Sequence, residues 1–169
     1  LQMTALQSRP ALKPGSLEIE LRWALDIVNN QHTAINDFLK IKKQYERSVM
    51  LGDHENAASQ LDEIRSICGA TLWEIESNIA YLAAFQGFDA QKSYITTLTS
   101  ENRRTFAAFF ASNIGERNEA RVSMEGYQRR LLEKIEKWNI SKSFGTYIYY
   151  RLTGNIVDIE SIPIILAQE

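Results

Sequence analysis

Glycines interrupt a helical pattern of apolar residues at four places, and this arrangement limits the folds that the chain can adopt. Apolar side chains recur at steps of three and four residues, which is the period of an amphipathic helix and not of a β-strand. Each glycine is followed within two residues by an acidic residue or an asparagine that can begin a new helix. The glycines are Gly52, Gly87, Gly115 and Gly154, and the residues that follow them are Asp53, Asp89, Glu116 and Asn155. The pattern predicts an all-α chain with a hairpin turn at each glycine.

The spacing of these glycines indicates a repeat. They lie 35, 28 and 39 residues apart, with a mean of 34. The stretch "LGDHENAASQLDEI" from Leu51 also returns as "IGERNEARVSMEGY" from Ile114, and in both an alanine, Ala57 or Ala120, stands five residues after the glycine. A small side chain at that point lets two antiparallel helices approach closely. Because one helical pair cannot cover its own apolar face, the repeat predicts that successive pairs stack on one another.

The periodicity and the capping residues predict eight to nine helices after an irregular or mobile segment over residues 1–15. Ser16, Asp53 and the pair Thr71 and Glu74 have the positions of helix N-caps. The predicted helices cover about 17–29, 34–51, 54–68, 72–87, 89–99, 100–115, 117–138 and 142–154, with a further short helix from Asn155. The first of them is expected to be well buried because apolar residues occupy most of its circumference. Residues 16–169 are expected to form a single helical-repeat domain.

Composition excludes several classes of protein. The 169 residues, 44% of them hydrophobic, are enough to fold around a core, and the net charge of −2 is not that of a protein that binds nucleic acid through its overall charge. The one cysteine, Cys68, permits no intramolecular disulfide, and with His32 and His54 it fits no compact zinc motif. The longest apolar run covers residues 79–85, whereas a membrane span needs about twenty residues. We therefore expect a cytoplasmic protein that holds no cofactor and spans no membrane.

The two ends of the chain suggest a fragment of a longer protein. The sequence starts at Leu1 rather than at a methionine and stops in "SIPIILAQE", an apolar run with no turn residue after it. We expect truncation at the C-terminus, so that an apolar edge is left there. The remainder of the chain or a second copy would cover this edge, whose residues are Ile162, Ile164, Ile165 and Leu166.

The segments "GDHENA" and "GERNEA" resemble the turn between the two helices of a tetratricopeptide repeat, where a glycine, polar residues and a close-packing alanine follow in this order. The resemblance covers roughly Ala34 to Asn155. It departs from the family in its unequal intervals, and in a first helix with Ile41, Tyr45 and Ser48 where the family has a large aromatic, a Leu-Gly or Leu-Ala pair and a tyrosine. The resemblance implies a right-handed stack of helical hairpins, which is an α-solenoid.

The same resemblance implies a partner-binding surface lined by the first helix of each pair. Two stripes of residues are candidates for this surface. The first is Asn36, Lys40, Lys43 and Arg47, and the second is Glu74, Asn78 and Tyr81. The first stripe suits an acidic peptide or protein segment. Its spacing also fits the ordinary solvated face of an amphipathic helix, and the sequence leaves both interpretations open.

Two other classes of function have weaker support. A run of arginines beside the phenylalanines of "TFAAFF" offers base stacking next to positive charge, but acidic residues dilute it and the phenylalanines have the spacing of a core. The arginines are Arg103, Arg104, Arg117, Arg121, Arg129 and Arg130. The chain has no phosphate-binding loop, and no nucleophile motif accompanies its two histidines. The sequence thus predicts neither a nucleic-acid-binding protein nor an enzyme.

These observations favour a protein-interaction or scaffolding module of a larger cytoplasmic protein, which binds a peptide or a protein surface through its helix faces. The alternative is a regulatory or substrate-recognition segment of a multidomain enzyme or nucleic-acid-handling protein whose active domain lies outside this chain. The sequence does not separate these two interpretations, because neither requires catalytic residues here.

Overall fold

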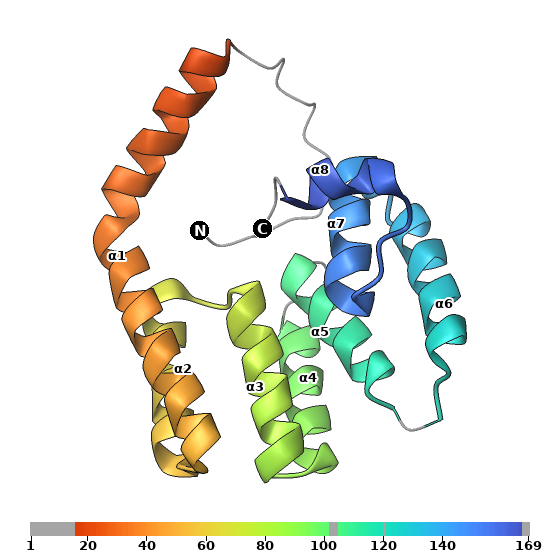
Figure 1. Cartoon of the computed structure of the whole chain (residues 1–169). Helices are drawn as coiled ribbons and strands as arrows, with labels where there is room; N and C mark the ends of the chain where they lie inside the picture. The colour runs from red at the N-terminus through yellow and green to blue at the C-terminus, as the bar shows by residue number, and fades with distance from the viewer. Residues whose placement is uncertain (1–15, 102–104, 120, 167–169) are drawn as a thin grey trace. The chain divides into compact units, whose positions relative to one another are not determined.

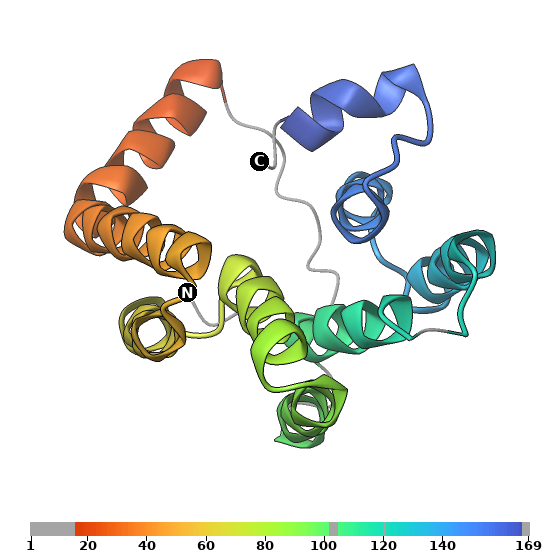
Figure 2. The same ribbon diagram turned by 60° about the horizontal axis from the view of Figure 1, so that its bottom comes forward.

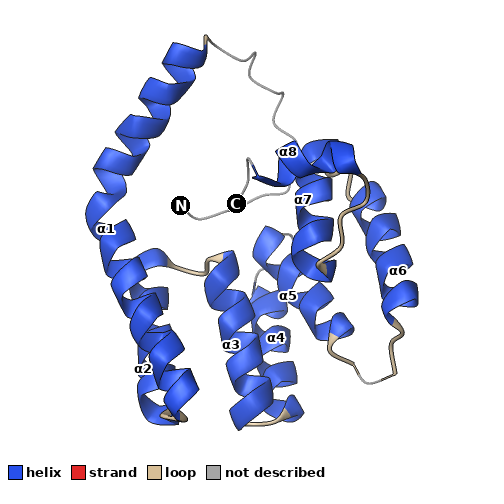
Figure 3. Ribbon diagram, in the orientation of Figure 1, coloured by secondary structure: helices blue, strands red, loops and turns tan. Residues whose placement is uncertain are grey.

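The computed structural model describes residues 16–101, 105–119 and 121–166, and it is all-helical there, as predicted (Figures 1 and 3). The predicted irregular segment over 1–15 lies outside these residues. The helices are α1 (Leu17–Leu51), α2 (His54–Cys68), α3 (Leu72–Phe85), α4 (Phe88–Glu101), α5 (Phe106–Arg117), α6 (Met124–Lys137), α7 (Lys142–Thr153), the 3₁₀ helix η1 (Ile159–Ser161) and α8 (Ile162–Leu166). The chain divides into two compact units, and the boundary falls between Gly87 and Phe88. We call them unit 1 (α1 to α3) and unit 2 (α4 to α8).

The first helix of unit 1 is continuous over 35 residues (Figure 2). Ser16 caps its start, where the hydroxyl accepts a hydrogen bond from the backbone N–H of Ile19, and Gly52 ends it at a φ of 72°. The predicted break between 29 and 34 is therefore wrong. Neither glycine nor proline occurs in "NNQHT", and His32 Nδ1 lies 2.7 Å from the carbonyl oxygen of Asn29 one turn earlier. The helix passes through these polar residues because nothing in them prevents its hydrogen bonds.

The two halves of α1 differ in burial. In the second half Ile41, Tyr45 and Ser48 are buried, and α1 packs there against α2. In the first half the apolar side chains lie largely in solvent, and Trp23 is 64% exposed. The prediction that the helix over 17–29 is well buried is thus wrong. An apolar circumference indicates burial only if neighbouring elements are long enough to cover it, and α2 has only 15 residues against the 35 of α1.

The hairpin between α1 and α2 follows the sequence prediction closely. The side chain of Asp53 caps α2 by accepting a hydrogen bond from the backbone N–H of Asn56, and α2 ends at Cys68 before Gly69. Ala57 is fully buried in a cluster with Tyr45, Leu61 and Tyr81. The small alanine side chain thus allows close packing at the position where it was expected.

Unit 2 is built around pairs of adjacent helices, α4 with α5 and α6 with α7. Its largest fully buried side chains come from α5, α6 and α7, and they are Phe110, Asn113, Ile114, Tyr127, Leu131, Ile148 and Leu152. Two predicted boundaries are wrong. The helix expected from Ser100 starts at Phe106, where the Thr105 hydroxyl caps it, and the helix expected from Arg117 starts at Met124 after Ser123.

The four glycines of the predicted repeat do not have equivalent structural roles. Gly52 and Gly154 end α1 and α7 in the left-handed conformation, and Gly87 follows α3 with a φ of 88°. Gly115, in contrast, lies inside α5, two residues before its end, so the turn predicted at this position is wrong. A Cβ atom on Gly115 would lie 2.9 Å from Cδ1 of Ile95 in α4. Gly115 is therefore a point of close helix packing, and the second copy of the repeated stretch does not form a hairpin like the first.

The C-terminal edge is only partly exposed. No helix starts at Asn155; the chain instead runs through η1 into α8. Within the predicted edge Leu166 is 72% exposed, whereas Ile165 is buried. Ile162 is 37% exposed and Ile164 is half-buried. The edge thus already contributes to the packing of unit 2.

Candidate functional site

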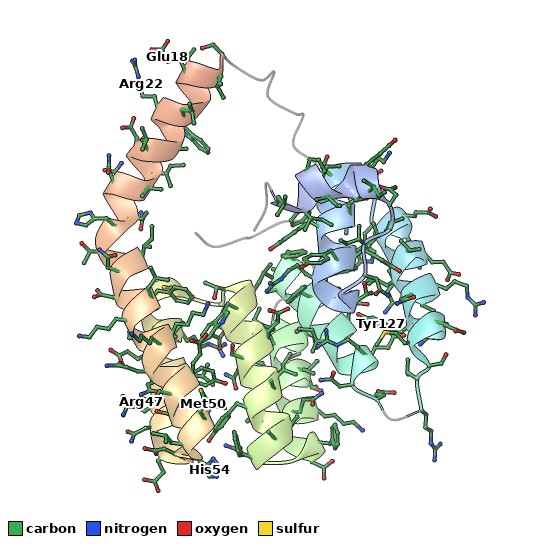
Figure 4. All side chains as sticks on the ribbon, viewed as in Figure 1. Glu18, Arg22, Arg47, Met50, His54 and Tyr127 are labelled. Carbon is green, nitrogen blue, oxygen red and sulfur yellow. The ribbon has the colours of Figure 1, made fainter. Side chains whose placement is uncertain are left out.

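The first predicted stripe is exposed to solvent on α1. Asn36, Lys40, Lys43 and Arg47 are all exposed, at steps of four, three and four residues, and we call them the basic face. Figure 4 shows Arg47 on the outer side of the helix. The three cations form no ion pair with any residue that the structure describes, whereas the nearby Glu46 lies 3.9 Å from Nζ of Lys42. The basic face therefore presents three unneutralised charges along about 10 Å of helix.

A polar groove of about 400 Å³ adjoins the basic face between α1 and α2. It is lined by Gln44, Arg47, Ser48, Asn56, Ser59, Gln60 and Glu63. The carbonyl oxygen of the Gln60 side chain is buried there without a hydrogen-bond partner in the described part of the chain. The groove thus adds hydrogen-bonding capacity beside Arg47.

The second predicted stripe faces the interior of unit 1. Glu74 is 0% exposed, lies 3.7 Å from Nη1 of Arg65 and accepts a hydrogen bond from the side-chain amide of Asn78. Tyr81 is also buried, and its hydroxyl donates to the backbone carbonyl of His54 at 3.1 Å. Glu74 and Tyr81 hold α3 against α2 and are not available for a partner. For Glu74 and Tyr81 the interpretation as a contact surface is therefore wrong, whereas Asn78 is only half-buried.

Unit 2 contains an ionic cluster that the sequence analysis missed. Glu116 accepts hydrogen bonds from Nε of Arg130 at 2.6 Å and from Nζ of Lys134, and Lys134 also donates to the buried side chain of Asn113 at 3.1 Å. Burial by itself raises the pKa of Glu116, but the bonds from Lys134 and Arg130 outweigh it, so the pKa lies below its ordinary value of 4.5. The cluster joins α5 to α6. The one signal for it is the four-residue step between the two cations, which is common on solvated helices.

Replacement of Glu116 by glutamine is expected to lower the unfolding free energy by about 1 kcal/mol at neutral pH, because two charge-assisted hydrogen bonds are weakened. Since the folded state lowers the pKa of Glu116, its contribution is complete above about pH 4.5 and is lost as the pH falls through the lower folded pKa. Denaturation series between pH 3 and pH 7 should therefore show a smaller acid-induced loss in Glu116→Gln. The neighbouring Glu119→Gln, an exposed control, should behave as the wild type; equal effects would contradict this assignment.

A cavity of about 760 Å³ lies between α4 and α5. The buried Gln91, whose side-chain carbonyl oxygen has no hydrogen-bond partner within the described residues, borders it, as do charged residues of both signs. The charged residues are Lys92, Glu116, Glu119 and Arg121. Glu116 is already paired with Arg130 and Lys134, so it is not free to bind a ligand in this cavity.

Phenylalanines and arginines that a nucleic-acid surface would need make contacts within unit 2 instead. Phe106, Phe109 and Phe110 are buried and cannot stack on bases. Arg117 donates to the backbone carbonyl of Leu152 at 3.0 Å, and Arg130 binds Glu116. Arg103 and Arg104 lie outside the described residues. The aromatic residues of "TFAAFF" are thus core residues, as their spacing indicated.

The described residues show neither a metal centre nor a membrane span. Over residues 16–101, 105–119 and 121–166, no group of three histidine, cysteine, aspartate or glutamate side chains is placed to hold a metal ion. In the same ranges no helix has both the length and the apolar character needed to cross a membrane. No family model, curated protein or solved structure matches the chain.

Proposed function

We propose that this chain is a non-catalytic protein-interaction module that binds an acidic peptide or protein segment along the basic face of α1. The observation that carries the proposal is the row formed by Lys40, Lys43 and Arg47, which are exposed and have no acidic partner in the described structure. Solvated helix faces usually alternate in charge, so a row of one sign indicates a surface for the opposite sign.

The groove beside Arg47 supplies the second element of recognition. A peptide that places carboxylates against the basic face also meets the exposed polar side chains that line the groove, such as Asn56 and Ser59. Charge would then steer the encounter, while hydrogen bonds in the groove would set the register of the bound segment. This division of roles is typical of sites that recognise short acidic segments.

The architecture around the basic face fits a scaffolding module. We infer a scaffolding role within a larger cytoplasmic protein, with stacked helical hairpins that resemble tetratricopeptide repeats. The hairpin between α1 and α2 supports this architecture, because Gly52, Asp53 and Ala57 hold the positions that the resemblance requires. The helical position of Gly115 shows that any such repeat is irregular.

Reversal of the basic face tests the binding proposal. We expect Lys40→Glu combined with Lys43→Glu and Arg47→Glu to weaken binding of a fluorescent poly-glutamate peptide about tenfold or more, because attraction becomes repulsion. Fluorescence anisotropy at low salt gives the affinity, and added salt should weaken binding by the wild type.

The matched control reverses three exposed cations of unit 2, Arg129, Lys137 and Lys142, so that the net charge changes equally. The control should lose much less affinity than the α1 variant. Equal losses would show that only overall charge matters, and absence of binding by the wild type would overturn the proposed function.

A further inference from the structure

Exposed residues in the first half of α1 form a regular seam. Leu21, Val28 and Ile35 recur every seven residues, and Leu25, His32 and Leu39 recur every seven residues between them. The steps therefore alternate between four and three, which is the a and d pattern of a coiled coil. The five apolar members are between 38% and 62% exposed. We call these six residues the α1 seam.

The α1 seam occupies a narrow and separate strip of the helix. At about 100° per residue, its six members fall within about 80° of the circumference. The residues that pack α1 against the rest of unit 1 are Ile41, Tyr45 and Ser48, and their centre lies about 150° around the helix from the centre of the seam. The centre of the basic face lies about 70° from the centre of the seam. A second helix can thus lie on the seam without disturbing the core of unit 1 or covering the centre of the basic face.

Charges at the two ends of the seam determine the direction in which such a helix would run. The heptad pattern continues to Glu18 before Leu21 and to Lys42 after Leu39. If a second copy lay parallel, Glu18 would face Glu18 and Lys42 would face Lys42. In an antiparallel pair centred near residue 30, the a position of one copy meets the d position of the other, so Glu18 faces Lys42 at both ends.

Glu18 and Lys42 have only weak partners within the chain, so each can form an ion pair with the other residue in a second copy. Glu18 pairs with Arg22 at 3.0 Å, but both side chains are at least 75% exposed and such pairs are weak (Figure 4). Lys42 lies 3.9 Å from Glu46 and 5.7 Å from the centre of the Trp73 ring, with a third of its side chain in solvent. Each can gain an opposite charge without leaving a buried partner unpaired.

We propose that two copies of this chain associate through the α1 seam as an antiparallel helix pair. In this register Leu21 of one copy packs against Leu39 of the other, Leu25 against Ile35, and Val28 against His32. The compact parts of unit 1 then lie at opposite ends of the pair. His32 is the one polar member of the seam, and a single polar residue at an a position fixes register at some loss of affinity.

Sedimentation equilibrium of the whole chain tests the association. The wild type is expected to be a dimer. The double variant Leu25→Asp with Ile35→Asp is expected to raise the dissociation constant of the dimer at least about a hundredfold, because an aspartate of one copy then faces an aspartate of the other at two places in the pair. Both residues are exposed in the single chain, so circular dichroism should confirm that the variant stays folded. Leu166→Asp, on the exposed edge of α8, is the matched control and should leave the dimer unchanged. A monomeric wild type, or a dimer lost only in Leu166→Asp, would overturn the proposal.

Cross-linking tests the direction of the pair. In a Cys68→Ser background, Leu21→Cys and Leu39→Cys are prepared as separate variants, mixed and oxidised. The antiparallel register predicts a disulfide between the two variants and none when Leu21→Cys is oxidised alone. A disulfide in Leu21→Cys alone, without the mixed product, would show a parallel pair and refute the register.

Discussion

Replacement of Phe110 by alanine is expected to lower the unfolding free energy of unit 2 by about 3–5 kcal/mol, the cost of removing a buried aromatic ring and leaving a cavity. Phe110 is 0% exposed at the centre of α5, and its ring centre lies 5.8 Å from that of Phe106. Phe106 in turn packs on Phe144 of α7 at 4.9 Å. The substitution therefore removes a contact in the chain of aromatic rings that joins α5 to α7.

Urea denaturation followed by circular dichroism measures this effect. Phe88→Ala is the matched control, since Phe88 is 59% exposed at the start of α4, and its loss should stay below about 0.5 kcal/mol. Similar losses in the two variants would mean that α5 does not form the centre of unit 2.

Replacement of Trp73 by alanine is expected to lower the unfolding free energy of unit 1 by about 3 kcal/mol. The Trp73 ring makes edge contacts with Phe38 and Tyr45 of α1, with both pairs of ring centres 5.5 Å apart. Each such contact adds to the area that the ring buries. Trp73 therefore joins α3 to the middle of α1, at the point where the exposed half of that helix meets the packed half.

Trp23→Ala provides the comparison for Trp73→Ala in the same denaturation experiment. Trp23 lies on the same helix as Phe38 and Tyr45 but is exposed, and it is not a member of the α1 seam. Its removal should change the unfolding free energy by less than about 0.5 kcal/mol. A large loss in Trp23→Ala would show that the first half of α1 is packed within the chain after all.

Helix boundaries could be predicted where a cap and a stop residue act locally. Asp53 and Gly69 fix both ends of α2, and Thr71 fixes the start of α3, because their hydrogen bonds involve residues at most four positions away. Gly115 shows the limit of this reasoning. A glycine can end a helix or admit a neighbouring side chain, and only the approach of Ile95 from α4 distinguishes the two uses.

Of the two predicted stripes of the candidate site, only the first is exposed as expected, and the reason is related. Helical spacing shows which residues share a face, but it does not show whether another helix covers that face. Lys40, Lys43 and Arg47 are exposed as expected, whereas Glu74 and Tyr81 have the same kind of spacing and are buried. The contacts that cover them come from Arg65 and His54 in α2, and no local pattern in α3 indicates those partners.

The length of α1 has a consequence for how its first half is held in order. An isolated helix in water is only marginally stable, and residues 17–39 gain little from tertiary packing. Their centre, "NNQHT", consists mainly of weak helix formers. In the proposed pair, burial of the α1 seam offsets part of the conformational entropy lost on ordering this segment. In the proposed antiparallel pair helix formation and association are thermodynamically linked, so substitutions at Asn29, Asn30 or Thr33, which lie outside the α1 seam, that raise helix propensity are expected to strengthen association without touching the partner.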